Sequence, residues 1–251
     1  MQKIFERPKA LSKNPFHYCP GCDHGVIHRM VAESLDELEV TNKSIGVAPV
    51  GCSVFAYDYF DIDFNSAPHG RAPAVATGIK RVHPDSIVFS YQGDGDCAAI
   101  GTAEIVHAAN RGENITVVFV NNAIYGMTGG QMAPTTLVGM KTATSPYGRD
   151  AKTMGHPIKM SEMLSTLTAP AFVARVSIHN VANLMKAKKA IKRAFEVQKE
   201  KKGFSFVEVL AICPTNWGKP PVEAHKWLEE NMVPVFPLGV FKDQTGGPAV
   251  L

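Results

Sequence analysis

The stretch GDGDCAAIGTAEIVHAANRGENITVVFVNN, residues 93–122, decides the fold, because it joins two strand ends through one helix. A β-rich run at 86–90 leads into Gly93-Asp94-Gly95-Asp96, a helical pattern follows at 97–111, and a second β-rich run at 115–120 ends in Asn121-Asn122. A strand, a helix and a strand in this order form a right-handed crossover between parallel strands. The sequence therefore predicts an α/β fold around a parallel sheet.

The same alternation continues on both sides of this unit. Further β-rich runs lie at 44–48, 172–177 and 204–210, with helical patterns at 72–82 and 181–199. A helical repeat of apolar residues from Val26 to Leu38 predicts another helix directly after the turn Cys19-Pro-Gly-Cys22. We expect a mostly parallel sheet with helices on both faces.

The remaining segments predict how the chain is organised. We expect one domain over 1–251, with an N-terminal arm, 1–25, that carries the cysteine pair, and a Pro-rich C-terminal extension, 217–251. This extension has one short helical pattern near 223–232 and is expected to wrap the body or a neighbour. Residues 122–160 are rich in Gly, Thr and Pro, which predicts a long functional loop.

Composition excludes several classes of protein. The chain has 251 residues and a formal net charge of +3, with acidic and basic residues interspersed, so no nucleic-acid partner is expected. The locally basic stretch 186–202 lacks interleaved aromatic residues and fits a solvated helix face. No apolar run approaches the length of a membrane span, and the first twenty residues do not resemble a secretory signal. We expect a cytoplasmic protein whose five cysteines stay reduced.

Polar residues at the two strand ends predict a site for a phosphate group and a cation. Gly93 and Gly95 leave backbone amides open at a helix N-terminus, which suits a phosphate. The crossover places Asn121-Asn122 beside them, and a carboxylate, an amide oxygen and a backbone carbonyl form a hard oxygen site for Mg²⁺. The competing interpretation is a tight glycine turn beside an ordinary strand cap.

This pattern resembles the signature of thiamine-diphosphate enzymes, a Gly-Asp-Gly followed after one helix and one strand by an Asn-Asn pair. The resemblance implies the thiamine-diphosphate-binding fold, with Mg²⁺ bound by Asp94, the Asn122 side chain and the Ile124 carbonyl. It also implies that the diphosphate lies along the glycine loop and a second loop, at Gly93, Gly95, Asp96, Gly126 and Met127.

The cysteines allow three interpretations. Cys19 and Cys22 suit a redox-active pair, which needs no further cysteines, while zinc and a 4Fe-4S cluster each need four ligands. Zinc sites usually have a second close pair, whereas Cys52 and Cys213 are isolated in the sequence, and this favours iron–sulfur over zinc. Spacing alone does not choose between the two metals.

The chain as a whole resembles the β subunit of 2-oxoacid:ferredoxin oxidoreductases. The resemblance spans nearly the whole chain and rests on segments that occur in the same order: 18–25 (YCPGCDHG), 51–53 (GCS), 69–72 (HGRA), 93–96 (GDGD), 122–131 (NAIYGMTGGQ) and 213–214 (CP). It implies that one 4Fe-4S cluster is bound by Cys19, Cys22, Cys52 and Cys213, close to the thiamine, and that Val50, Gly51 and Ser53 touch the thiamine. Cys97 lies outside this set, and we expect it to be a buried apolar residue.

The resemblance also implies the reaction, the oxidative decarboxylation of a 2-oxoacid to acyl-CoA and CO₂ with electrons passed through the cluster to ferredoxin. No glutamate here is a candidate to activate the thiamine, and the family implies that an α subunit supplies the pyrimidine half of the site. Further γ and ferredoxin-like δ subunits fit the same pattern. His69 is expected near the reacting carbon or as a helix cap, and His24 near the diphosphate or as a cap of the following helix.

Two other functions stay open. A non-redox thiamine-dependent decarboxylase or lyase would use the same Mg²⁺ motif and treat the cysteines as structural, and a zinc-stabilised binding module would bind no thiamine. For an oxidoreductase, the segments 48–52 (APVGC) and 147–149 (YGR) resemble chains that act on 2-oxoisovalerate, with 2-oxoglutarate as the second candidate.

Overall fold

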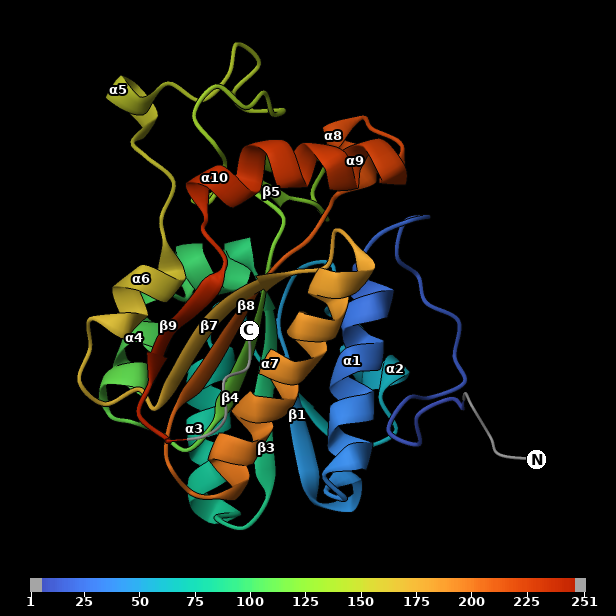
Figure 1. Cartoon of the computed structure of the whole chain (residues 1–251), viewed down its shortest axis with the longest axis vertical. Helices are drawn as coiled ribbons and strands as arrows, with labels where there is room; N and C mark the ends of the chain where they lie inside the picture. Colours follow the sequence, from blue (N-terminus) through green and yellow to red (C-terminus); the bar gives the residue numbers. More distant parts are fainter. Residues whose placement is uncertain (1–5, 247–251) are drawn as a thin grey trace.

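A seven-stranded sheet forms the centre of the molecule in the computed structural model, which describes residues 6–246 (Figure 1). The outer ends of the predicted arm and extension, 1–5 and 247–251, lie outside the described residues. The strand order is β2-β1-β3-β4-β8-β7-β9, and only the pairing of β7 with β9 is antiparallel. The strands are β1 (Ser44–Ala48), β2 (Asp63–Ser66), β3 (Ile87–Gly93), β4 (Thr116–Asn121), β7 (Phe172–Ser177), β8 (Ser205–Leu210) and β9 (Gly239–Asp243). The predicted mostly parallel α/β fold is confirmed.

The inner strands are buried on both faces. In each of the strands β4, β7 and β8, all six residues are buried, as expected for parallel strands covered by helices on each side. The two edge strands, β2 and β9, are partly exposed and polar, and the sequence patterns do not predict them. Continuous apolar runs therefore mark the centre of the sheet but not its edges.

Helices cover the sheet in two layers. On one face α1 (His24–Glu37) packs against α7 (Val181–Lys199), and both contribute to one hydrophobic cluster. The other face carries α3 (Ala72–Val82), the π-helical turn η2 (Asp96–Ile100), α4 (Thr102–Asn110) and α6 (Met160–Ser165), in a second cluster. The predicted helix at 97–111 is thus divided at Gly101 into η2 and α4.

Short elements gather beyond the carboxyl ends of the strands (Figure 1). The chain after β8 forms α8 (Pro214–Trp217), α9 (Pro221–Trp227), η3 (Leu228–Met232) and α10 (Val233–Val235), which share a small hydrophobic cluster with Ala123 and Leu137. The predicted loop 122–160 contains only β5 (Ile124–Tyr125), β6 (Gln131–Met132) and α5 (Ala151–Met154). The remaining short helices are η1 (Thr41–Lys43) and α2 (Ala56–Tyr59).

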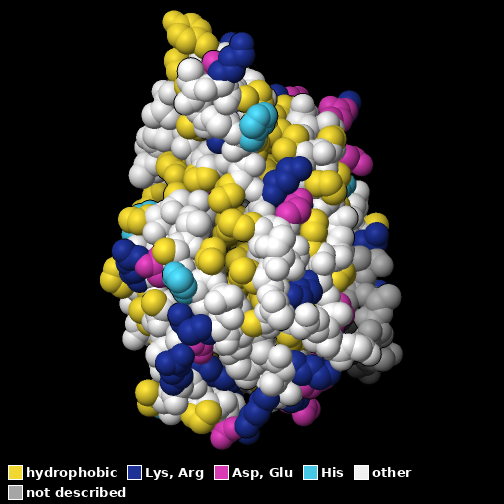
Figure 2. Space-filling view, turned by 90° about the vertical axis from the view of Figure 1, so that its left-hand side faces the viewer, with side chains coloured by type: hydrophobic (Ala, Val, Ile, Leu, Met, Phe, Trp, Pro, Cys, Tyr) yellow, Lys and Arg dark blue, Asp and Glu magenta, His cyan; other side chains and the backbone are white. Residues whose placement is uncertain are grey.

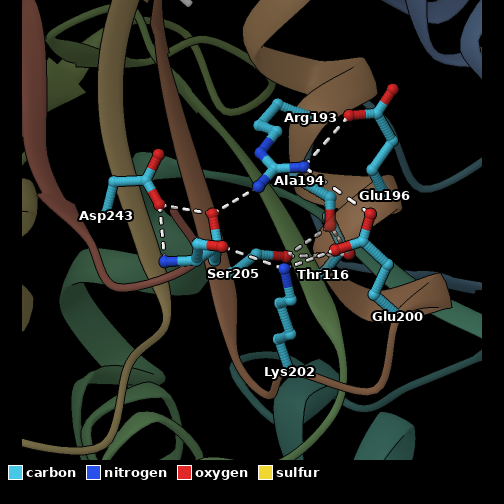
Figure 3. Close-up of polar contacts among 9 residues, drawn as sticks. Thr116, Arg193, Ala194, Glu196, Glu200, Lys202, Ser205 and Asp243 are labelled. Atoms are coloured by element: carbon cyan, nitrogen blue, oxygen red, sulfur yellow. Dashed lines mark hydrogen bonds and ion pairs between the residues drawn. The ribbon is translucent and has the colours of Figure 1, made fainter. Parts of the chain in front are cut away.

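A polar network fastens the end of β9 to the body (Figure 3). Arg193 of α7 donates to the Thr245 hydroxyl, and Lys202 Nζ donates to the Thr245 carbonyl oxygen at 2.9 Å. Arg193 also contacts Glu196 at 3.3 Å. These contacts hold the described chain after β9 against α7 and the residues that follow it.

The surface seen in Figure 2 is mixed. Hydrophobic side chains gather near the middle of this face, and Lys and Arg are more frequent in its lower half. Over residues 6–246, no helix combines the length and the apolar character that crossing a bilayer requires.

Candidate cofactor site at the carboxyl end of the sheet

The loops after β3 and β4 lie side by side, as the crossover predicts. The two strands are parallel neighbours, with Gly93 opposite Val120, and the Ile124 N–H donates to Asp94 Oδ2 at 3.0 Å. The Asn121 side chain points into the core, where its Nδ2 donates to Glu208 at 2.8 Å. Asn122 lines the cavity between the loops. The sequence separates the two loops by a whole helix and strand, and the fold brings them together.

Two polar groups, the Asn122 amide and the Ile124 carbonyl, converge beside Asp94. The Asn122 amide atom that faces inward lies 3.2 Å from Asp94 Oδ2 and 2.7 Å from the Ile124 carbonyl oxygen. If this atom is nitrogen, it donates to both acceptors. If it is oxygen, three oxygens face one point, which is the donor set of a hard cation. The second orientation is the one that the predicted Mg²⁺ site requires, and the ligand roles stay predictions.

Asp94 is held firmly within the protein. It is buried, and its carboxylate also accepts from the Gly95 N–H at 3.0 Å and the Thr135 hydroxyl at 3.0 Å. Burial raises the pKa of Asp94 to about 7, against the opposing effect of these hydrogen bonds. A cation beside the carboxylate would offset this cost of burial, so the site fits the metal.

A cavity of about 280 Å³ opens next to this cluster. Every residue that the sequence assigns to thiamine or its diphosphate lines it: Val50, Gly51, Ser53, Gly93, Gly95, Asp96, Gly126 and Met127. His24, Cys52 and His69 also line it. Residues from five separate segments of the sequence therefore meet at one cavity, and their individual roles stay predictions.

The His69 loop reaches the cavity through a close contact between two glycines. A Cβ on Gly70, whose φ is +79°, would lie 2.7 Å from the Gly101 nitrogen. A Cβ on Gly101 would lie 2.6 Å from the Gly70 carbonyl oxygen. Only glycine fits at either position, so the break between η2 and α4 is where the His69 loop packs.

His24 is the first residue of α1, and its ring is buried against aromatic neighbours. Its Nδ1 is 2.8 Å from the Tyr91 hydroxyl, and Tyr18 stacks on it at 4.7 Å. Burial lowers the pKa of His24 to about 4. His24 is therefore neutral near pH 7, and it does not supply a positive charge for a diphosphate.

Two of the four predicted cysteine ligands, Cys52 and Cys213, lie beside one glycine of the cavity lining. A Cβ on Gly126 would lie 3.0 Å from Cys52 Sγ and 3.5 Å from Cys213 Sγ, so both sulfurs approach this bare backbone. The turn at Cys19 and Cys22 closes with a 3.0 Å bond from the Cys22 N–H to the Cys19 carbonyl.

Asp23 ties this turn to the segment that carries Cys213. Its Oδ2 accepts from the Ile212 N–H at 2.8 Å, and its Oδ1 lies 3.0 Å from His225 Nε2 on α9. Ile212 immediately precedes Cys213, so the contact holds the segment of Cys19 and Cys22 beside the segment of Cys213. Nothing in the spacing of the sequence indicates this role for Asp23.

Burial affects the sulfurs of two predicted cluster ligands. Burial raises the pKa of Cys22 and of Cys52 to about 12, and each is raised further by Cys213. No three His, Cys, Asp or Glu side chains of residues 6–246 converge on one ion position. A 4Fe-4S cluster places each thiolate on a different iron, so the four sulfurs need only surround a larger group. The space left by Gly126 and the all-sulfur donor set fit such a cluster.

Cys97 stands apart from this set. It is fully buried in the hydrophobic cluster of η2, α3 and α4, as expected from the sequence. All five cysteines are free.

Arg149 holds the long loop, residues 122–160, together by hydrogen bonds. Its guanidinium donates to six carbonyl oxygens, those of Ala133, Pro134, Thr136, Met154, Gly155 and His156, at 2.7–3.4 Å. The adjacent Tyr147 is 97% exposed. All the donors of Arg149 are thus used by the loop, which in turn presents Thr135 to Asp94. Sequence reasoning missed Thr135, because it lies 41 residues from its partner in a segment without periodicity.

The region of the cavity matches a known protein family. Residues 49–209 match the family model described as thiamine pyrophosphate enzyme, C-terminal TPP binding domain. The matched segment includes the glycine loop, the Asn-Asn pair and Cys52, and it excludes Cys19, Cys22 and Cys213.

Several curated proteins are similar over most of the chain. The ketoisovalerate oxidoreductase subunit VorA of Methanothermobacter thermautotrophicus is 49% identical over 98% of the chain and 51% of its own length. The 2-oxoglutarate synthase subunit KorB of Methanocaldococcus jannaschii is 36% identical over 87% of the chain and 79% of its own length. The chain therefore spans about half the length of the first relative and most of the second.

One solved structure is similar over nearly the whole chain. It is a 2-oxoglutarate:ferredoxin oxidoreductase from Magnetococcus marinus with 2-oxoglutarate, coenzyme A and succinyl-CoA bound. It aligns with 26% sequence identity and a TM-score of 0.80, over 99% of this chain and 88% of that one.

Proposed function

Because this chain belongs to the family of 2-oxoacid:ferredoxin oxidoreductase subunits with a thiamine pyrophosphate-binding domain, we propose that it is the β subunit of such an enzyme. With its partner subunits, the enzyme converts a 2-oxoacid and coenzyme A to acyl-CoA and CO₂ and passes electrons to ferredoxin. The position of Cys52 carries this proposal. Cys52 lines the cavity that we propose for thiamine, and its sulfur lies beside Gly126, as does the sulfur of Cys213.

The cofactor and its metal would be bound from two loops. Asp94, the Asn122 side chain and the Ile124 carbonyl hold Mg²⁺, and the backbone at Gly93, Gly95, Gly126 and Met127 lies along the diphosphate. Val50, Gly51 and Ser53 contact the thiamine. When bound, thiamine diphosphate supplies an electron sink for decarboxylation, and the chain positions it and excludes water.

The redox part would rest on the cysteines. Cys19, Cys22, Cys52 and Cys213 hold one 4Fe-4S cluster, which supplies a one-electron acceptor next to the thiamine when bound. The Asn216 side chain donates to Cys213 Sγ at 3.3 Å and to the Gly126 carbonyl oxygen at 2.9 Å. These contacts support Cys213 as a thiolate ligand, because a donated hydrogen bond stabilises negative charge on sulfur.

A partner subunit is needed to complete the site. Within the described residues, the carboxylates that line the cavity are Asp94 and Asp96, and no glutamate is among them. The glutamate that thiamine activation requires would therefore come from an α subunit, together with the pyrimidine half of the site. Ferredoxin, coenzyme A and possible γ and δ subunits complete the proposed assembly.

The cavity favours a branched-chain 2-oxoacid such as 2-oxoisovalerate. Its lining among the described residues includes the apolar Val50, Ile100 and Met127 and contains no Lys or Arg. A 2-oxoglutarate-specific pocket would need a cation for the second carboxylate, because a buried unpaired carboxylate is costly. The apolar lining therefore agrees with the ketoisovalerate relative more than with the 2-oxoglutarate relatives.

The test is reduction of a viologen dye by the anaerobically purified complex, with coenzyme A and a panel of 2-oxoacids. We expect reduction with 2-oxoisovalerate at a kcat/KM at least about tenfold above that with 2-oxoglutarate, a difference of about 1.4 kcal/mol. Decarboxylation without dye reduction would indicate a non-redox thiamine enzyme and would refute the proposal.

Iron analysis of two matched variants tests the cluster directly. Cys213→Ala should remove the bound iron, while Cys97→Ala should keep it, because Cys97 lies in the hydrophobic core. Zinc in place of iron in the wild-type protein, or equal iron in both variants, would contradict the cluster assignment.

A further inference from the structure

The Asp96 carboxylate is buried and accepts four hydrogen bonds inside the protein. Oδ1 accepts from the Val50 N–H at 3.0 Å and the Gly70 N–H at 2.9 Å, and it lies 2.7 Å from His69 Nδ1. Oδ2 accepts from Gln92 Nε2 at 2.6 Å. Asp96 is 1% exposed. The carboxylate thus faces the loops around the cavity rather than offering free oxygens to a ligand.

This arrangement fixes which nitrogen of His69 carries hydrogen. The Val50 and Gly70 partners are backbone N–H groups, which only donate. Gln92 is oriented by the Ser90 hydroxyl, which lies 2.9 Å from Gln92 Oε1 and leaves Nε2 facing Asp96. Oδ1 already accepts from two backbone N–H groups and Oδ2 accepts from Gln92, so the carboxylate is placed as an acceptor toward His69 as well. His69 Nδ1 must therefore donate, and in the neutral ring Nε2 is left as the acceptor.

The backbone holds His69 in this position. Gly70 packs against Gly101 at a distance that leaves no room for a Cβ, so the loop cannot slide along η2. His69 lines the cavity, and its side chain is 42% exposed while that of Asp96 is fully buried. The ring is thus anchored at Nδ1 and remains accessible from the cavity.

We propose that Asp96 is a positioning residue that holds His69 in the Nδ1–H form, so that Nε2 accepts a proton from the bound substrate. This inference rests on the proposed function. In the step, the O–H bond of a substrate-derived hydroxyl breaks, its electron pair stays on oxygen, and an N–H bond forms at Nε2. The resulting imidazolium faces the Asp96 carboxylate, which stabilises it, as a carboxylate behind a catalytic histidine does in other enzymes.

A histidine spectrum of the full chain tests the tautomer without any activity. In ¹⁵N-histidine-labelled protein near pH 8, the His69 signals, identified by their loss in His69→Gln, should show a protonated Nδ1 and a bare Nε2. Asp96→Asn keeps the size of the side chain and removes its charge, and it should change this pattern. A wild-type His69 with its hydrogen on Nε2 would overturn the proposal.

A double-mutant cycle in the assembled complex tests the coupling. Asp96→Asn should lower kcat at least about tenfold while changing KM and thiamine diphosphate affinity less than about twofold. In a His69→Gln background it should have no further effect, because residues that act as a unit are not additive. If Asp96→Asn lowered kcat equally in the wild-type and His69→Gln backgrounds, Asp96 would not act through His69. If cofactor affinity fell as much as kcat, the role of Asp96 would be only structural.

Asp85→Asn is the matched control for these measurements. Asp85 is an exposed aspartate that pairs with Lys201 at 2.8 Å, away from the cavity lining, so kcat and the His69 signals should stay unchanged. A complex without any 2-oxoacid oxidation would refute the proposed function, whereas the tautomer measurement decides the role of Asp96 separately.

Discussion

The Asp94 side chain has three properties that bear on metal binding. It is buried, it organises two loops by accepting from Gly95, Ile124 and Thr135, and it lies beside the Asn122 amide. A buried carboxylate is costly unless its charge is compensated. Hydrogen bonds supply part of that compensation in the protein alone, and the proposed cation would supply the rest.

Replacement of Asp94 should abolish metal-dependent cofactor binding. At a concentration 100 times Kd, thiamine diphosphate with Mg²⁺ should stabilise the wild-type protein by about 2.7 kcal/mol. In a domain of this size that raises Tm by about 5–10 °C. Asp94→Asn should lose this shift, because the amide cannot balance the cation. Differential scanning fluorimetry with and without EDTA measures it, and an undiminished shift in the variant would rule out Asp94 as a ligand.

At the level of elements, the loop after β4 depends on one buried guanidinium. Arg149 donates to six carbonyl oxygens, and the pKa of Arg149 is lowered by burial. Arg149→Met should leave carbonyls unpaired, at about 1–3 kcal/mol for each group that water cannot reach. Urea unfolding should show the loss of stability, and cofactor affinity should fall because Thr135 no longer reaches Asp94. Arg149→Lys should retain only part of the stability and only part of the cofactor affinity.

The preference among 2-oxoacids separates this structural role from substrate binding. If Arg149 only supports the loop, the variant should lose activity equally for 2-oxoisovalerate and 2-oxoglutarate. A selective loss for the dicarboxylic substrate would mean that Arg149 binds the substrate, contrary to its contacts here.

Helix α9 is joined to the start of α1 by a titratable pair. The hydrogen bond that His225 Nε2 donates to the Asp23 carboxylate raises the pKa of His225, against the opposing effect of burial. A raised pKa in the folded state stabilises the fold below the unfolded value, which is about 6.5. This stabilisation disappears as the pH rises through the folded pKa. The difference in unfolding free energy between wild type and His225→Gln should therefore be larger at pH 5.5 than at pH 8.5.

Denaturant unfolding of both proteins at the two pH values measures this difference. His107→Gln is a suitable control, because His107 lies on α4, on the opposite face of the sheet. A gap between wild type and His225→Gln that is constant with pH would show that the pair contributes no pH-dependent stability.

For the whole molecule, the centre of the fold could be predicted and its edges could not. The strands β1, β7 and β8 and the helices α3 and α7 follow from apolar runs and helical repeats, because burial on two faces or one stripe leaves a period in the sequence. The edge strands β2 and β9 alternate less clearly, since half-exposed residues need not be apolar.

The site divides in the same way. The glycine loop, the Asn-Asn pair and the cysteines could be predicted, because their residue types are tied to their chemistry. Gln92, Thr135 and Asp23 act through hydrogen bonds to residues 4, 41 and 189 positions away. No local pattern encodes such contacts, and only the fold shows them.

The cavity is open toward a surface with exposed apolar side chains. Ile100 and Met127 line it and are 52% and 54% exposed. Apolar groups of this kind around an incomplete catalytic site indicate contact with a partner. The missing glutamate and the exposed apolar rim thus lead to the same expectation, that the site closes at a subunit interface.

The isolated chain should therefore bind thiamine diphosphate and Mg²⁺ weakly and show no turnover, while addition of the α subunit should restore both. Ile100→Asp and Met127→Asp should weaken co-elution of the two subunits in gel filtration, because each places a charge in an apolar contact. Val82→Asp is the matched control and should leave assembly intact, because Val82 is the last residue of α3 and is 74% exposed. Full turnover by the chain alone would contradict the shared site. Unchanged assembly of both rim variants would place the partner on another face.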